Sequence, residues 1–389
     1  MTMNEDIKRS GMIVLGSTGS VGTQALDVAE RTGTPVEAIC ANHDVTAVEA
    51  QVRKFGVKAC AMADANAAQQ LKIKLADTSV RVYAGEQGIA DMIAAAQAPI
   101  ALNAIIGEAG LNSTLAVLQA NKQLALANKE SLVVAGEIVM REARERGIEI
   151  RPVDSEHCAI AQALRAGEHG EVKKLILTAS GGPFFGKKRE QLTGVRASDA
   201  LAHPTWSMGA KITVDSASMM NKGFEIIEAA YLFDIPTDRI DVVVHRESII
   251  HSMVEYIDHS IIAQMSVPDM RHCIQHALTH PAREAAAIAP LDLVTIGKLT
   301  FAAPDEQAFP LLGAARRAMR EGGAVPAVLN AANEVAVDAF LHDRIGFLAL
   351  SDIVCEVAER LHDAKTARTL EEILHFDRLA RQMAQSYIN

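Results

Sequence analysis

Several features are scarce in this chain, and each absence excludes a class of protein. No apolar run approaches the ~20 residues that a membrane span requires, and the polar, mixed-charge residues 1–10 do not form a signal sequence. The five cysteines are scattered and odd in number, without a Cys-x-x-Cys spacing, which argues against a disulfide framework or a zinc ribbon. Cys158, beside His157, is better interpreted as a small buried thiol than as a catalytic one. We therefore expect a soluble cytoplasmic protein that does not associate with membranes.

Positive charge is also in deficit. The formal net charge is −10, which argues against binding to nucleic acid or to an anionic membrane. An anionic substrate would then need a local basic pocket. With 389 residues, 49% of them apolar and 22% charged, the chain has an ordinary globular composition and enough length for two or three domains.

Short apolar segments alternate with helical ones in the first half of the chain. The expected strands are Met12–Leu15, Val36–Cys40, Lys58–Met62, Val80–Tyr83, Ile100–Ala104, Leu124–Ala127 and Ile148–Val153. The helical segments between them include Thr23–Arg31, Val45–Phe55, Ala65–Leu75 and Leu111–Ala120. This alternation predicts an α/β fold with a doubly wound, Rossmann-like parallel sheet.

The first strand runs into a glycine-rich turn, Gly16-Ser17-Thr18-Gly19-Ser20-Val21-Gly22, followed by a helix. Glycines allow a close approach to a pyrophosphate, and the helix N-terminus supplies donors. After the second strand, Asn42 and His43 are compatible with an additional phosphate, while Asp44 is either an acidic ribose contact or a helix cap. NADP is favoured over NAD.

Two further strand ends carry polar residues. Asn128-Lys129-Glu130-Ser131 is either a plain helix start with a solvated lysine or part of a site. Asp154 and Glu156 point the same way if the backbone is extended, and they would then share one hard cation. The alternative is that Asp154 and Ser155 cap a helix with Glu156 in its first turn.

The second half contains three polar stretches. Thr178–Pro183 is an anion-binding nest or a tight turn. Leu201–Gly209 holds the only tryptophan, Trp206, which is either a core residue or part of a lid. In Lys211–Ala229 we expect a helix from Met219 onward with Asp215, Ser216 and Ser218 near its cap. Asn221 and Lys222 are donors suited to a phosphate, and Glu225 follows about one turn later.

Six motifs in this order resemble the 1-deoxy-D-xylulose 5-phosphate reductoisomerase family over essentially the whole chain. They are Gly16–Gly22, Asn128–Ser131, Val153–His157, Ser180–Phe184, His203–Gly209 and Met219–Glu225. The resemblance implies conversion of 1-deoxy-D-xylulose 5-phosphate, a sugar phosphate, to 2-C-methyl-D-erythritol 4-phosphate with NADPH and a divalent cation. The cation would be Mg²⁺ or Mn²⁺, with Co²⁺ as an alternative. Neither a retro-aldol/aldol route nor a ketol migration is favoured by the sequence.

The resemblance also implies roles for individual residues. The metal ligands would be Asp154, Glu156 and Glu225, and with Lys129 and His203 they would form the catalytic set. The substrate contacts would be Lys129, Glu130, Ser155, Ser180, His203, Trp206, Ser216, Asn221 and Lys222, with Met208 beside Trp206 on a flap. The cofactor contacts would be Thr18, Gly19, Ser20, Val21, Asn42, His43, Gly107, Asn128, Glu130, Gly209 and Met270. Where many relatives have Gly-Lys after the second strand, this chain has Asn42-His43, so the contact to the 2′-phosphate is not assigned.

We expect a nucleotide-binding domain over residues 1–153, a catalytic and dimerisation domain over 154–280, a linker over 281–308 and a helical domain over 309–389. Within the second of these, Val242–His245 and Ile261–Met265 would extend an antiparallel sheet that, by resemblance, forms a homodimer interface. Expected helices are Asp269–His280, Ala314–Arg320, Ala327–His342 and Leu350–His362. Two alternatives stay open: a metal-independent NADP dehydrogenase, and a non-catalytic cofactor-sensing module.

Overall fold

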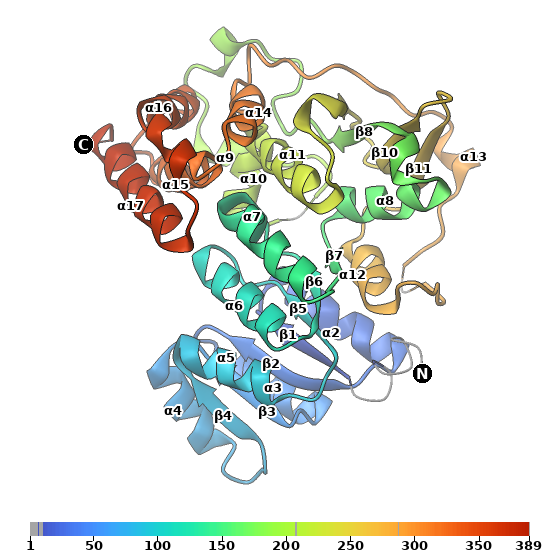
Figure 1. The fold of residues 1–389 in the computed structure, drawn as a ribbon, viewed down its shortest axis with the longest axis vertical. Coiled ribbons are helices and arrows are strands. Elements are labelled where there is room, and N and C mark those ends of the chain that lie inside the picture. The colour runs from blue at the N-terminus through green and yellow to red at the C-terminus, as the bar shows by residue number, and fades with distance from the viewer. Residues whose placement is uncertain (1–6, 8–10, 207, 287, 389) are drawn as a thin grey trace. The chain divides into compact units, whose positions relative to one another are not determined.

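The structure is a computed structural model that describes residue 7 and residues 11–206, 208–286 and 288–388 (Figure 1). The chain forms two compact units. Unit 1 consists of Met1–Ser131, Val139–Cys158 and Asp269–Ala289, and unit 2 of Leu132–Ile138, Ala159–Pro268 and Pro290–Asn389. The four-domain division expected from the sequence stays a prediction.

Unit 1 is built on a parallel sheet of seven strands in the order β4-β3-β2-β1-β5-β6-β7. The strands are β1 Met12–Leu15, β2 Val36–Ala41, β3 Ala59–Met62, β4 Arg81–Ala84, β5 Ile100–Asn103, β6 Gln123–Leu126 and β7 Ile150–Pro152. The helices are α2 Ser20–Thr32, α3 Val45–Phe55, α4 Ala65–Lys74, α5 Gly85–Ala95, α6 Glu108–Gln119, α7 Glu130–Glu145, α8 Ser155–Ala163 and α12 Met270–Thr279, of which α7 and α8 continue into unit 2.

The strand order reverses beside β1, which pairs with β2 on one side and β5 on the other. The predicted doubly wound parallel sheet is therefore confirmed. In such sheets ligands bind outside the carboxyl ends of the strands where the order reverses. The turn after β1 and the loop after β5 occupy this position, and they place the glycine-rich segment where the sequence analysis requires it.

Unit 2 contains a four-stranded sheet in the order β11-β10-β8-β9. Its strands are β8 Val172–Ala179, β9 Ile240–Val244, β10 Ile250–Tyr256 and β11 Ile261–Met265. β10 is antiparallel to both of its neighbours, whereas β9 is parallel to β8. The expectation that β9 extends an antiparallel sheet is therefore wrong. The long connection between β8 and β9 includes α9, α10 and α11 and returns the chain in its original direction, as a parallel pair requires.

The helices of unit 2 are α9 Ala197–Ala200, α10 Ala210–Ala217, α11 Met220–Phe233, α13 Leu293–Ile296, α14 Leu311–Glu321, α15 Val325–Leu341, α16 Phe347–Arg360 and α17 Leu370–Ser386. α15 is buried along most of its length and packs against α14, α16 and α17. The predicted C-terminal helices are confirmed, and α17 was not predicted.

One local prediction in unit 2 is wrong in part. Asp215 and Ser216 lie in the last turn of a separate helix, α10, whereas Ser218, the C-cap residue of α10, accepts a hydrogen bond from the Met220 N–H at 3.4 Å at the start of α11. Met219 has a positive φ of 65°, which ends α10 and turns the chain into α11. A left-handed residue between two helical segments gives no clear pattern in the sequence.

Candidate functional site

The glycine-rich turn fits closely against its own backbone. Gly16 has a φ of 82°, and the N–H groups of Gly16 and Ser17 donate to the Cys40 carbonyl at the end of β2. A Cβ at Gly22 would lie 2.1 Å from the Gly16 oxygen, so the first turn of α2 lies against the loop. Gly19, the residue before α2, makes no side-chain cap to the helix. A long helix with no capping side chain at its N-terminus fits a pyrophosphate.

The loop after β5 adjoins this turn. A Cβ at Gly16 would lie 2.8 Å from the Ala104 carbonyl oxygen. The loop ends at Gly107, whose φ of 70° starts α6 and whose carbonyl accepts a hydrogen bond from Asn128 Nδ2 at 3.4 Å. Unit 1 thus brings the glycine turn, Gly107 and Asn128 together at one edge of its sheet.

The polar residues after β2 divide into two groups. Asp44 Oδ1 accepts a hydrogen bond from the Ala47 N–H at 3.0 Å and caps α3. The cap interpretation of Asp44 is therefore confirmed. Asn42 and His43 are both exposed just beyond the end of the strand.

Lys129 and Asp154 join the ends of the neighbouring strands β6 and β7. The Lys129 ammonium forms an ion pair with Asp154 Oδ2, and both side chains are largely buried. Asn128 Oδ1 accepts from the Ser131 N–H at 2.7 Å, and Asn128 Nδ2 donates to Glu130 Oε2 at 2.9 Å. Asn128 therefore accepts a hydrogen bond from the first turn of α7, as a plain helix start predicts, but Lys129 is not a solvated lysine.

Asp154 begins α8. Its Oδ1 accepts hydrogen bonds from the backbone N–H groups of Glu156 at 3.0 Å and His157 at 3.3 Å. Ser155 Oγ contacts Glu156 Oε2 in the first helical turn. The extended backbone is therefore wrong and the helix cap is the geometry found, but the two carboxylates still bring oxygens within 4.8 Å of each other. A cap through one oxygen leaves the second oxygen of Asp154 for a cation such as the ammonium of Lys129.

Unit 2 gathers a second set of polar residues around the end of β8. Ser180 Oγ accepts from the Gly182 N–H at 3.3 Å. A Cβ at Gly182 would lie 2.8 Å from the Ser216 carbonyl oxygen, so this turn lies directly against the end of α10. Ser180 and Ser216 are both half-buried, and the turn brings the Ser180 hydroxyl to a backbone N–H beside the end of α10.

His203 is the neutral partner of Ser180. Its Nδ1 accepts from the backbone N–H groups of Thr205 at 3.2 Å and Trp206 at 2.9 Å, so the ring proton lies on Nε2, which is 2.9 Å from Ser180 Oγ. Burial, together with the nearby positive charge of Arg246, lowers the pKa of His203 below its usual 6.5. His203 is thus a hydrogen-bond donor at neutral pH and carries no charge.

Arg246 lies among the predicted site residues of unit 2 but was not predicted from the sequence. Its guanidinium donates to the Gly182 carbonyl at 3.3 Å and lies over the Phe185 ring, and its own carbonyl accepts from Thr205 Oγ1 at 3.4 Å. Arg246 therefore links the Ser180 turn to the Trp206 loop and adds positive charge there. Its position just after the apolar strand β9 was the only signal in the sequence.

The first turns of α11 present a buried charge pair. Glu225 is 1% exposed and accepts hydrogen bonds from Asn221 Nδ2 at 2.6 Å and from the Lys222 ammonium. Met219 makes no side-chain cap to α11, and Ser218 Oγ accepts from the Met220 N–H. The other N–H groups of the first turn add donors beside Asn221 and Lys222. The cluster combines an anion-attracting helix start with one carboxylate.

The remaining expected contacts lie on loops and at helix starts. Trp206 is half-buried, with its ring 6.4 Å from that of His251, and Gly209 is the exposed residue before α10. In unit 1, Met270 begins α12 and packs partly buried against the apolar core. The five cysteines are thiols and form no disulfides, and Cys158 is fully buried, as expected of a structural residue.

Three family descriptions match successive parts of the chain. "1-deoxy-D-xylulose 5-phosphate reductoisomerase" matches residues 12–136, its C-terminal domain matches residues 150–233, and "DXP reductoisomerase C-terminal domain" matches residues 265–383. A reductoisomerase of this name from Acetivibrio thermocellus is 49% identical over 375 residues, 96% of this chain and 98% of the relative. One from Chlorobium chlorochromatii is 48% identical over 377 residues, 96% of this chain and 98% of the relative.

Solved structures agree. The reductoisomerase from Zymomonas mobilis in complex with NADPH has a TM-score of 0.90 and 41% identity, covering 97% of this chain and 98% of that one. A DOX-P reductoisomerase in complex with NADPH, fosmidomycin and magnesium has a TM-score of 0.92 and 37% identity with the same coverage.

The parallel sheet with a glycine turn at its reversal point, followed by a unit with an anion-attracting cluster, defines a dinucleotide-binding α/β protein of the oxidoreductase class. The comparisons make this specific. The chain belongs to the 1-deoxy-D-xylulose 5-phosphate reductoisomerase family. Among the described residues, no helix has both the length and the apolar character needed to cross a membrane.

Proposed function

We infer that this chain converts 1-deoxy-D-xylulose 5-phosphate to 2-C-methyl-D-erythritol 4-phosphate with NADPH and Mg²⁺ or Mn²⁺. The observation that carries this is similarity over nearly the whole chain to reductoisomerases, including a structure that contains NADPH and magnesium. A similarity confined to the nucleotide-binding unit would equally fit the plain dehydrogenase considered above. The similarity is not confined to the nucleotide-binding unit, because the family descriptions also match residues 150–233 and 265–383.

The cofactor binds at the reversal point of the unit 1 sheet. Its pyrophosphate lies against Thr18–Val21 at the start of α2, and Gly107 and Asn128 border it from the next strand ends. Asn42 and His43 extend from β2 toward the adenosine end, and Met270 contacts the nicotinamide ring. The absence of a side-chain cap at Gly19 supports this assignment, because the first N–H groups of α2 then serve the phosphates.

Asp154, Glu156 and Glu225 hold the divalent cation. Three carboxylates without a thiolate or imidazole make the oxygen donor set that Mg²⁺ and Mn²⁺ prefer. When bound, the cation supplies Lewis acidity to the ketone and hydroxyl oxygens of the substrate. Lys129 holds Asp154 in place through its ion pair and, together with Glu130 and Ser155, orients the sugar chain.

The phosphate of the substrate binds in unit 2. Ser180, Ser216, Asn221 and Lys222 supply hydroxyl, amide and ammonium donors, and neutral His203 donates from Nε2. Arg246 adds the positive charge that a chain of net charge −10 needs for an anionic ligand. Trp206 and Met208 cover the substrate and exclude water during reduction.

We further propose a cytoplasmic homodimer. Five free thiols fit a reducing compartment. β11 is an edge strand of its sheet, and Ile261 and Ile262 on it are 53% and 38% exposed. An exposed apolar edge strand favours pairing with a second copy.

The dimer is tested by changing Ile261 to lysine. A charge on this face is expected to shift the sedimenting species from dimer to monomer, because it must be desolvated on association. The same change at exposed Ile73, on α4 in unit 1, is the control. A dimer unaffected by Ile261→Lys would place the interface elsewhere.

The reaction is tested by mixing the protein with 1-deoxy-D-xylulose 5-phosphate, NADPH and Mg²⁺ and following nicotinamide absorbance. Removing divalent ions with EDTA is expected to abolish turnover, and added Mg²⁺ or Mn²⁺ to restore it. Turnover that survives EDTA would favour the metal-independent dehydrogenase. Tight NADPH binding without consumption would favour the cofactor-sensing module.

A further inference from the structure

α12 packs within unit 1, although residues Ala159–Pro268 of unit 2 separate it in sequence from the other elements of unit 1. Ile274, Ala277 and Leu278 on α12 share the apolar core with Ala25 and Val28 on α2. α2 is the helix that starts at the glycine-rich turn. The packing therefore joins the helix that receives the phosphates to the helix whose first residue is Met270.

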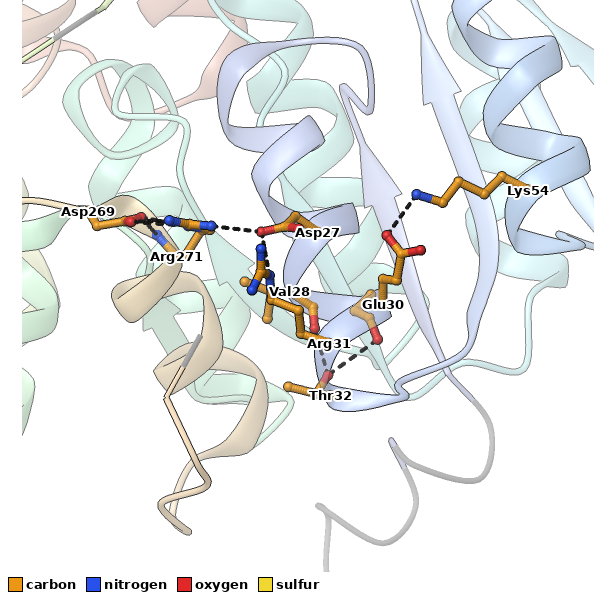
Figure 2. A network of polar contacts seen from close by, with 9 residues as sticks. Asp27, Val28, Glu30, Arg31, Thr32, Lys54, Asp269 and Arg271 are labelled. Carbon is orange, nitrogen blue, oxygen red and sulfur yellow. Dashed lines mark hydrogen bonds and ion pairs between the residues drawn. The ribbon is translucent and has the colours of Figure 1, made fainter. Parts of the chain in front are cut away.

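The two ends of α12 are held by different contacts. Near its C-terminus, Arg151 on β7 donates to the Ala277 carbonyl at 3.0 Å. At its N-terminus, Arg271 lies between two carboxylates (Figure 2). It donates from Nε and Nη2 to Asp269, at 3.0 and 2.5 Å, and from Nη1 to Asp27 Oδ2 at 3.1 Å.

Both carboxylates are themselves fixed. Asp269 caps α12 by accepting from the Arg271 N–H at 3.0 Å, and Asp27 also accepts from Arg31 Nε at 2.9 Å on its own helix. The hydrogen bonds from Arg271, which outweigh burial, lower the pKa of Asp269. Burial alone would raise the pKa of Asp27, but Arg31 and Arg271 together lower it. Both groups are therefore ionised at neutral pH.

We propose that Arg271 is a positioning residue for hydride transfer, and this rests on the function proposed above. With Asp27 and Asp269 it fixes the first turn of α12 against α2. That contact sets the position of Met270, the next residue toward the N-terminus, relative to the nicotinamide. The planar guanidinium suits this role because its donors address two carboxylates at once in a fixed geometry.

A positioning role predicts a particular pattern of kinetic effects. NADPH affinity comes largely from the phosphates at the glycine turn, which Arg271 does not contact, so the Kd should change by no more than about twofold. Hydride transfer depends on the placement of the nicotinamide ring, and small displacements of reacting groups lower the rate strongly. We expect Arg271→Met to lower kcat roughly tenfold.

The experiment compares Arg271→Met, Arg271→Lys and Asp27→Asn, each with NADPH carrying hydrogen or deuterium at the transferred position. The isotope effect on kcat should rise in Arg271→Met as hydride transfer becomes slower than the other steps. Arg271→Lys should recover part of kcat, because lysine keeps the charge but contacts one carboxylate at a time. Asp27→Asn keeps the Asp269 pair, so its effect should be smaller, and it serves if Arg271→Met does not fold.

The matched control is Glu30→Gln. Glu30 lies on α2 as Asp27 does, but it pairs with Lys54 on α3 at 2.7 Å, away from α12 (Figure 2). Its kcat and isotope effect should equal those of the unmodified protein. The inference is overturned if Arg271→Met lowers only the melting temperature, or if Glu30→Gln causes the same kinetic loss. If the unmodified chain does not oxidise NADPH, the proposed function and this inference both fail. If only the variants lose activity, the proposed function stands and the inference alone is being tested.

Discussion

Replacing Glu225 by glutamine is expected to lower kcat by about 10²–10³-fold while leaving the Kd for NADPH nearly unchanged. The variant keeps the size of the side chain but removes one of the three negative charges proposed to hold the cation. Lewis-acid assistance is worth several kcal/mol of barrier, and each 1.36 kcal/mol is tenfold in rate. Steady-state turnover at saturating Mg²⁺ and direct titration with NADPH provide the two measurements.

The burial of Glu225 requires a check on folding. Glu225 and Lys222 are 1% and 4% exposed and form an ion pair. Removing one partner of a buried pair typically costs about 3–5 kcal/mol, so the variant should melt at a lower temperature. Intact NADPH binding would show that the nucleotide site proposed for unit 1 is folded.

Glu228→Gln is the control for this prediction. Glu228 lies on the same helix one turn later and is 4% exposed, but it is not a proposed ligand. It should retain kcat within a few-fold and require no more Mg²⁺ than the unmodified protein. Full turnover in Glu225→Gln, or equal losses in both variants, would contradict the metal-ligand assignment.

The parts of the fold that follow from local pattern were predicted well. β1 and α3 have the bounds expected from an apolar run and from a segment between Asp44 and Gly56. β10 was missed because His251, Ser252 and Glu255 interrupt its apolar pattern, although all three are buried. Two of these side chains are paired with residues outside the strand: Glu255 accepts a hydrogen bond from Lys173, and His251 is hydrogen-bonded to Ser266. Such long-range partners give no local signal.

The same limit applies to the site. Motif order located Lys129 and Asp154, and the parallel sheet explains why they meet, because β6 and β7 are neighbours. The sequence predicted that the carboxylates of Asp154 and Glu156 face the same point, and their oxygens do lie within 4.8 Å of each other. The extended backbone was wrong, because Asp154 caps a helix whose first turn contains Glu156. Arg271 could not be assigned from the sequence, since its partner Asp27 is 244 residues away.

Replacing Gly22 by alanine is expected to have the second large effect, a rise in the Kd for NADPH of at least about tenfold. The new Cβ would lie 2.1 Å from the Gly16 oxygen and 2.7 Å from Ser17 Cα. Both are backbone atoms, so the clash cannot be relieved by rotating a side chain, and either the turn or the start of α2 must move. If the N–H groups of that turn and helix hold the phosphates as proposed, their fixed positions are lost.

Gly346→Ala is the control, because Gly346 also precedes a helix and a Cβ there meets nothing within 4 Å. Binding is measured by titration with NADPH, and melting temperature separates a displaced turn from an unfolded unit. The displaced turn predicts a higher KM for NADPH, with kcat partly recovered at saturating cofactor. Unchanged NADPH affinity in Gly22→Ala would show that the turn accommodates the Cβ without weakening binding. It would contradict the placement of the phosphate site at the start of α2.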